Sequence, residues 1–403
     1  MVLMVDEIAT EKRIRWDDQT NHFLGVCRQH GKATSLDFNT VEDMIELFDC
    51  LDKGEVHYAA EATVAALGIL SEDTRIYAGR PILISGDCKR ESGVEHAKVL
   101  QTVLDAIDRL KDKIGLRVVS IASDGETRRG SSLAQMTLKK KLEASSPIYP
   151  LLKDLVFMDF HIGPNDITAD KDWKHVVKRI RNYTIRARGV VIRDFRITPA
   201  IIANHLKSAG HTAVHVNALF NPEDSQDVTL AFNLLKDIWT LPMITDHSNP
   251  SFIAARHALR ILGKLLHHIV FPYLCTELSL SEQLEHLSAA IHLAFALYYD
   301  AGSQFMPTLL YQDLVIMVKN IIFCVAKAKN DDMDGKLYII LLGTDRLEEL
   351  FGILRTMIGN DANLDIFQLA SRLTGTTQVS NILAKYPQWD RSPRRLKLPA
   401  LTR

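Results

Sequence analysis

The feature that most constrains the fold is a change in hydrophobic periodicity along the chain. Up to about residue 160, apolar runs typical of strands alternate with amphipathic helical segments, which indicates an α/β order. From about residue 198 to 329, almost every segment has helical periodicity. The α/β character returns at residues 337–342 (LYIILL), before a helix that begins near Thr344 or Asp345. This pattern predicts a sheet domain interrupted by a helical insertion.

Individual elements follow from the same patterns. We expect strands at residues 2–9, 22–28, 62–70, 81–85, 116–122 and 155–159, and helices at residues 39–52, 94–110 and 131–144. Asn39 or Thr40 is a suitable cap for the first helix. The first strands are close enough in sequence to pair antiparallel, with residues 22–28 as the partner of residues 2–9. We therefore predict a mixed five-stranded sheet with flanking helices.

A chain of 403 residues exceeds the usual size of one domain, so we expect several compact parts. We place a sheet domain at residues 1–197, the helical insertion at 198–336, a return to the sheet domain at 337–386 and a basic extended tail at 387–403. Apolar residues make up 47% of the chain, a share typical of a folded protein rather than a disordered one.

Charge and cysteine usage limit the functional classes. The net charge of −1 shows no overall basic footprint for nucleic acid, so local charge must carry any such function. The cysteines are odd in number, and neither they nor the histidines show zinc-site spacing. This usage favours a reducing, intracellular compartment. The most apolar stretches, residues 287–299 and 315–326, are too short to cross about 30 Å of hydrocarbon, so we predict no membrane span.

Three acidic residues lie where a sheet-based metal site would need them. Asp6 sits inside the first apolar strand, where a charge is costly unless it is paired or binds a metal. Asp124 follows the strand at residues 116–122, and strand ends are where open α/β sheets place ligands. Glu348 lies in the first turn of the helix near Asp345. Carboxylates suit Mg²⁺ or Mn²⁺, and two such ions can assist phosphodiester cleavage. Glu348 could instead simply favour the helix dipole.

Short motifs in matching order resemble P-element and THAP-type transposases. They are residues 5–8 (VDEI), 123–125 (SDG), 172–182 (DWKHVVKRIRN) and 345–355 (DRLEELFGILR). The third, with its D-x-x-H-hydrophobic-hydrophobic-K pattern, is the most specific. The resemblance implies an RNase H-like core with Asp6, Asp124 and Glu348 as the catalytic, metal-binding acids, interrupted by a large all-helical insertion.

The same resemblance implies further features. The family associates its helical insertion with GTP, but this chain has no G-x-x-x-x-G-K-[ST] loop, and no residue is assigned to GTP. The family also places a zinc-dependent DNA-binding module before the catalytic core, which this sequence does not show. His175 and Asp172 are expected to support the active site. The basic residues expected to contact the DNA backbone are Lys174, Lys178, Arg179 and Arg181, although a solvated helix face would have the same pattern.

Three functional hypotheses follow. The first is a metal-dependent DNA nuclease or strand transferase of transposase descent, with DNA as its partner, no membrane association, and a nuclear or cytoplasmic location. The second is a catalytically silent transposase relic that binds nucleic acid or protein. The third is a nucleotide-dependent interaction protein built on the helical region. The resemblance leaves a homo-oligomer open.

Overall fold

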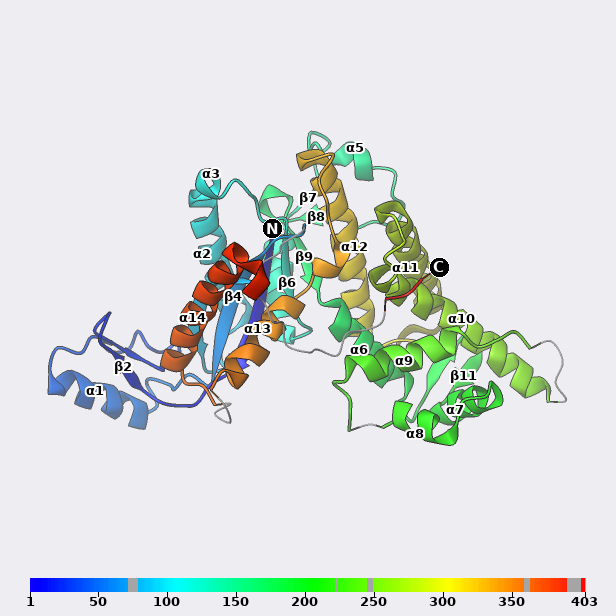
Figure 1. The fold of residues 1–403 in the computed structure, drawn as a ribbon, viewed down its shortest axis with the longest axis horizontal. Helices are drawn as coiled ribbons and strands as arrows, with labels where there is room; N and C mark the ends of the chain where they lie inside the picture. The colour runs from blue at the N-terminus through cyan, green and yellow to red at the C-terminus, as the bar shows by residue number, and fades with distance from the viewer. Residues whose placement is uncertain (72–78, 222, 245–248, 359–362, 390–399, 403) are drawn as a thin grey trace. The chain divides into compact units, whose positions relative to one another are not determined.

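The computed structural model of the protein describes residues 1–71, 79–221, 223–244, 249–358, 363–389 and 400–402 (Figure 1). Contacts between residues divide the chain into two compact units. Unit 1 comprises residues 1–170 and 323–393, and unit 2 comprises residues 171–322 and 394–403. These limits differ from the expected borders after residues 197, 336 and 386, and the four-part division stays a prediction. Most of the expected tail, residues 390–399 and 403, lies outside the described residues.

Unit 1 is built on a mixed five-stranded sheet with the strand order β5-β4-β1-β6-β9. The central strand β1 (Val2–Ala9) pairs antiparallel with β4 (Glu61–Gly68), which pairs antiparallel with β5 (Arg80–Asp87). On its other side, β1 pairs parallel with β6 (Ser120–Ser123), and β9 (Thr168–Lys171) lies beyond β6. Numbered along the chain, the five strands run 3-2-1-4-5 across the sheet. The expected RNase H-like α/β sheet is confirmed.

Helices cover this sheet. On one face lie α2 (Gly93–Arg109) and α4 (Thr127–Thr137), which pack against each other. Because side chains alternate along a strand, Leu3 and Val5 of β1 share this face, where they join a core with Leu100 and Leu133. Helix α13 (Asp345–Thr356) packs against β1 and α14 (Ile366–Lys385) against β5, and both lie over the strands in Figure 1.

Residues 10–60 form an insertion between two neighbouring strands, because Ala9 at the end of β1 pairs directly with Glu61 at the start of β4. The insertion contains the hairpin of β2 (Arg15–Asp17) and β3 (His22–Leu24) and the helix α1 (Val41–Asp52). Thr40 caps α1 in a reciprocal pair with Asp43, as the sequence allowed. A small apolar cluster holds the insertion together; its buried members are Phe23, Leu47, Cys50 and Val56.

Unit 1 also contains short elements between the larger ones. They are α3 (Lys111–Ile114), β7 (Lys140–Lys141), α5 (Tyr149–Leu152), β8 (His161–Ile162), and the 3-10 turns Pro164–Asp166, Ile339–Leu341 and Pro387–Trp389. The buried Lys327 ties the chain that returns from unit 2 to the sheet, because its Nζ donates to Val119 O at 2.7 Å and to Thr168 Oγ1 at 3.0 Å. A buried ammonium is tolerated when such acceptors surround it.

Unit 2 is mainly helical in its described residues. It contains α6 (Trp173–Thr184), α7 (Pro199–Ser208), α8 (Ala213–Leu219), α9 (Val228–Trp239), α10 (Pro250–Leu274), α11 (Leu280–Ala301), the 3-10 turn Gly302–Gln304 and the first part of α12 (Thr308–Asp331). A hairpin of β10 (Val190–Ile192) and β11 (Phe195–Ile197) packs on α10, which also contacts α9 and α11. The predicted helical character of residues 198–329 is therefore confirmed over the described residues.

Helix α12 combines length with low polarity. Among the described helices, it is the one long and apolar enough to span a membrane, with a mean hydropathy of 1.7 over its most apolar window. Of that window, 67% is buried inside the protein, and the core helices of folded domains share this property.

Several expected elements were wrong. Residues 22–28 do not pair with residues 2–9, because β3 pairs with β2. Residues 155–159 form no strand, since Phe157 has φ +64°, a left-handed conformation that interrupts extended backbone. Helix α4 ends at Thr137, so the lysines at 139–141 lie beyond it, partly in β7. The strand expected at 116–122 begins only at Ser120. Within the apolar segment 337–342, residues 339–341 form a 3-10 turn.

The packing of α2 on the sheet is testable with two substitutions on one helix. Leu100 is buried in the core, whereas Val94 is exposed. We expect Leu100→Ala to lower the free energy of unfolding by about 2–5 kcal/mol, because it leaves a cavity. Val94→Ala should change it by less than about 0.5 kcal/mol. Urea unfolding followed by circular dichroism measures both, and equal effects would contradict this packing.

Candidate active site

Asp6 and Asp124 lie side by side where the short strand β6 ends next to the middle of the parallel strand β1. Val5 of β1 is in register with Ser123, the last residue of β6, so the next residues on both strands are the two acids. Their side chains are 15% and 26% exposed. Such partly buried carboxylates lose hydration and need a compensating positive charge. The position at a strand end is one that open α/β sheets use for ligands.

Glu348 approaches from the helix that packs on β1. Thr344 lies at the N-cap of α13, and its carbonyl oxygen accepts a hydrogen bond from Glu348 N at 3.1 Å. A Cβ at Gly79 would lie 3.3 Å from Met4 Cε and 3.8 Å from Arg346 O, so Met4 faces the start of this helix. Asp6 is two residues after Met4 and therefore points to the same side of β1.

The electrostatics of Asp6 indicate that the three acids converge. Burial raises the pKa of Asp6 to about 6, against the lowering effect of Arg129. The charges of Asp124 and Glu348 raise this pKa further, and the backbone N–H of Glu7 opposes them by donating to Asp6 Oδ1 at 2.9 Å. The structure thus places Asp6 beside Asp124 and within electrostatic range of Glu348, although the three acids are far apart in the sequence. Their catalytic and metal-binding roles stay predictions.

A buried arginine compensates this negative charge. Arg129, in the first turn of α4, is only 3% exposed, and its Nη1 lies 3.2 Å from Asp6 Oδ1. The same guanidinium contacts Asp124 and Glu7, and its Nε lies 3.4 Å from Glu126 Oε2. One cation thus links the two neighbouring aspartates, which fixes their side chains and offsets part of their repulsion.

More ionic groups lie around this pair. Arg128 contacts Asp87 and lies 3.1 Å from Glu7 Oε1. Burial raises the pKa of Glu7 to about 7, although Arg129 opposes this shift. Carboxylates outnumber the arginines of α4 in this cluster, which comprises Asp6, Glu7, Asp87, Asp124, Glu126, Glu348, Arg128 and Arg129. The cluster therefore carries an excess of negative charge when all its carboxylates are ionised.

This donor set fits Mg²⁺ or Mn²⁺. Both cations prefer carboxylate oxygens, and three such groups converge here. The raised pKa of Asp6 shows that Arg129 leaves its charge incompletely compensated. Asp6, Asp124 and Glu348 are the residues that would hold the cations. Arg129 contacts Oδ1 of both Asp6 and Asp124, and the cations would share these oxygens with it.

The D-x-x-H motif at residues 172–182 lies in unit 2. Asp172 is buried and caps α6, because its Oδ1 accepts hydrogen bonds from Lys174 N at 2.9 Å and His175 N at 3.1 Å. This cap explains the aspartate of the motif in structural terms. The expected supporting role of Asp172 and His175 at the active site stays a prediction.

The four basic residues expected to contact DNA differ in exposure. Arg181 is fully buried, and its Nη2 donates to Leu219 O at 2.9 Å and Asn221 O at 2.8 Å. This corrects the expectation for Arg181, which stabilises the interior of unit 2. Lys178 is also buried, which argues against a backbone contact. Lys174 is partly exposed, as is Arg179, which contacts Asp313, and both stay predicted DNA contacts.

The sequence analysis did not identify Arg128 and Arg129 as site residues. A signal was present, since two adjacent arginines follow the strand-end Asp124 and open an amphipathic helix. The structure pairs Asp87 with Arg128, and Glu61 Oε1 lies 2.6 Å from Lys89 Nζ.

Comparisons with known proteins bear on the fold. No protein-family model matches the chain, and no curated protein matches it. Among solved structures, the Drosophila P element transposase strand transfer complex is similar, with a TM-score of 0.59 and 14% sequence identity. The match covers 95% of this chain and 76% of that chain. The fold is transposase-like. At this identity the likeness concerns the fold alone, and the THAP-type part of the resemblance stays a prediction.

The raised pKa of Asp6 predicts a pH-dependent stability difference. Its folded-state pKa is about 6, against about 3.9 in an unfolded chain. The folded protein therefore binds this proton more tightly, and the resulting stability is present below about pH 4 and lost as the pH rises through about 6. In EDTA, Asp6→Asn should match the wild type near pH 4 and exceed its unfolding free energy by on the order of 2–3 kcal/mol near pH 7. Urea unfolding at several pH values measures this difference, and a pH-independent difference would contradict it.

Proposed function

We propose that this chain is a transposase-derived, metal-dependent DNA nuclease or strand transferase. The observation that supports it most is the position of Asp6 beside Asp124, with Glu348 near enough for its charge to raise the pKa of Asp6. The transposase-like fold adds support, since the similar solved structure is a strand transfer complex. We expect the protein to act inside the cell, in a compartment where DNA is accessible, and its five free cysteines fit reducing conditions.

The proposed reaction is attack of a water or DNA 3′-hydroxyl oxygen on a phosphodiester phosphorus. The attacking oxygen loses its proton to solvent as a new P–O bond forms, the original P–O bond to the leaving oxygen breaks, and the leaving oxygen takes up a proton from solvent. Two bound Mg²⁺ or Mn²⁺ ions would supply activation of the attacking oxygen and stabilisation of the leaving oxygen. Asp6, Asp124 and Glu348 would hold these cations, while Arg129 keeps its contacts with Glu7 and Glu126.

Substrate binding requires positive charge, because phosphate contacts position a protein on DNA. Lys174 and Arg179 are the partly exposed basic residues of α6 that we propose for this role. They would add affinity without sequence preference, so binding should weaken as salt increases.

Nicking of supercoiled plasmid tests the proposal. We expect Mn²⁺-dependent nicking by the wild type and its loss in EDTA. Altering a residue that only contacts a metal ligand already lowers metal affinity or activity by about 10–100-fold. Asp124→Asn and Glu348→Gln, which change proposed ligands themselves, should therefore each lower the nicking rate by on the order of 100-fold or more. The control Asp108→Asn changes an exposed acid of α2 and should nick at the wild-type rate. Equal nicking by wild type and Asp124→Asn would show contamination and sink the catalytic proposal.

A second candidate function is favoured by the position of Arg129. Its guanidinium already bridges Asp6 and Asp124, as a resident cation would. A protein that keeps this bridge permanently would be a catalytically silent relic, binding nucleic acid or protein through the same fold.

Metal-dependent thermal shifts separate the two candidates. A ligand that binds only the folded state raises the melting temperature. For the enzyme, Mn²⁺ should stabilise the wild type and have little effect on Asp124→Asn. For the silent relic, Mn²⁺ should leave the wild type unchanged and stabilise Arg129→Gln, in which the carboxylates lose their bridging cation. Differential scanning fluorimetry over a Mn²⁺ series measures these shifts.

A further inference from the structure

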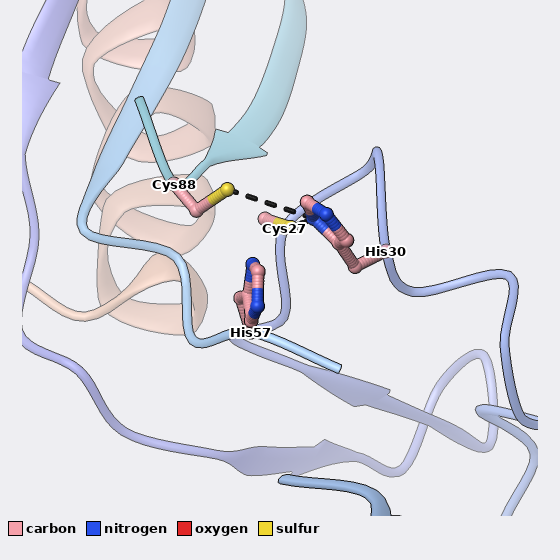
Figure 2. Close-up of side chains that lie close together, drawn as sticks. All are labelled: Cys27, His30, His57 and Cys88. Atoms are coloured by element: carbon pink, nitrogen blue, oxygen red, sulfur yellow. Dashed lines mark hydrogen bonds between the residues drawn. The ribbon is translucent and has the colours of Figure 1, made fainter. Parts of the chain in front are cut away.

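Four side chains of metal-binding types meet where the insertion at residues 10–60 joins the sheet: Cys27, His30, His57 and Cys88 (Figure 2). Cys27 and His30 lie in the turn after β3, His57 precedes β4, and Cys88 directly follows β5. One ligand atom from each lies within 4.8 Å of the others. Cys27 Sγ is 3.1 Å from His30 Nδ1, and Cys88 Sγ is 3.6 Å from the same nitrogen.

Backbone hydrogen bonds hold these three segments together independently of the side chains. Cys27 N donates to His57 O at 2.9 Å, and Arg28 N donates to Gly86 O at 2.9 Å. A Cβ at Gly86 would lie only 2.6 Å from Val26 O, so glycine permits this close approach. The four side chains are therefore positioned by the fold before any ligand binds.

The protein alone satisfies these polar groups poorly. Arg90 Nη1 lies 3.2 Å from His57 Nε2, while His57 Nδ1 is buried and has no hydrogen-bond partner among the described residues. A metal bond to His57 Nδ1 would give this nitrogen a partner and would favour the thiolates. His57 Nε2 would then carry the ring proton, so the Arg90 guanidinium would have to move away from it.

The ligand chemistry selects zinc. Two thiolates and two imidazoles form a Cys₂His₂ set, which is typical of closed, tetrahedral structural zinc sites. With Zn–S bonds of about 2.3 Å and Zn–N bonds of about 2.0–2.1 Å, tetrahedral geometry separates ligand atoms by about 3.3–3.8 Å. The observed S···N distances of 3.1 and 3.6 Å are near this range. Magnesium and calcium prefer oxygen ligands and do not suit this cluster.

We propose that Cys27, His30, His57 and Cys88 bind one structural zinc ion that fastens the insertion to the sheet. The spacing of cysteines and histidines along the chain did not predict this site, because β-pairing assembles its ligands from three separate segments. The insertion has only a small apolar core, whose buried members are Phe23, Leu47, Cys50 and Val56. Segments of this size commonly need a metal or disulfide for stability.

Two other groups of three potential ligands occur in unit 2: His267, His268 and His286, and His211, His215 and Asp237. Neither contains a thiolate or a fourth ligand among the described residues. The Cys₂His₂ cluster therefore has the strongest ligand set for zinc.

Metal content and cobalt spectroscopy test the proposal on the full chain, purified under reducing conditions from zinc-supplemented cells. We expect inductively coupled plasma mass spectrometry to find one zinc per chain. Replacement by Co²⁺ should give the visible bands of tetrahedral cobalt and a near-ultraviolet thiolate-to-cobalt absorption. This measurement uses the wild type and so does not depend on whether a variant folds.

Variants locate the ion. Cys88→Ser and His30→Gln should lose most of the bound zinc, whereas Cys50→Ala and His22→Gln, which alter the same insertion outside the cluster, should retain it. Asp124→Asn should also retain zinc, so this site is independent of the proposed catalytic function. Removing zinc with a chelator should lower the melting temperature and speed protease cleavage within residues 10–60.

Two results would overturn the proposal. A wild-type protein without zinc and without a tetrahedral cobalt spectrum would show that the four side chains are only a hydrogen-bonded cluster. Thiol titration and mass spectrometry showing a Cys27–Cys88 disulfide in the folded protein would show that the thiols serve as a covalent link instead.

Discussion

Charge compensation around Asp6 of β1 and Asp124, which follows β6, governs the arrangement of unit 1. A carboxylate that loses hydration must gain a positive partner, or its pKa rises until it is neutral. Parallel pairing of the two strands brings Asp6 beside Asp124, and α13 adds Glu348. Helix α4 begins directly after this point, so its positive N-terminal end and Arg129 both face the acids. The strand order, the position of α4 and the ionic contacts thus act together to compensate the charge of these carboxylates.

The sequence predicted the elements whose periodicity is strong. Strand β1, helix α2 and the start of α13 were expected close to their observed bounds, since each combines an apolar pattern with a clear boundary. The fifth strand was missed because β9 reads TADK, and its Asp170 is buried and accepts a hydrogen bond from Gly343 N at 2.8 Å. Tertiary contacts, which local patterns do not encode, allow so polar a strand inside the sheet.

For the candidate site residues too, local sequence patterns do not encode the tertiary contacts that bring them together. The resemblance indicated Asp6, Asp124 and Glu348, but their proximity depends on β-pairing and helix packing that no spacing rule contains. Arg129 was missed because its importance comes from the carboxylates it touches in space. Within the motif at residues 172–182, we predicted that Arg181 contacts DNA at the surface. The structure buries it, because an arginine whose N–H groups donate to backbone carbonyls can lie inside a helical unit.

The direct pairing of Ala9 with Glu61 has an evolutionary consequence. Because both ends of the insertion at residues 10–60 meet at adjacent positions of one antiparallel ladder, a tight turn could join the same two strands. The length and content of this segment can therefore vary among related chains while β1, and the acids that depend on it, keep their register. Such a segment is free to acquire a new binding surface without altering the chemistry of the sheet.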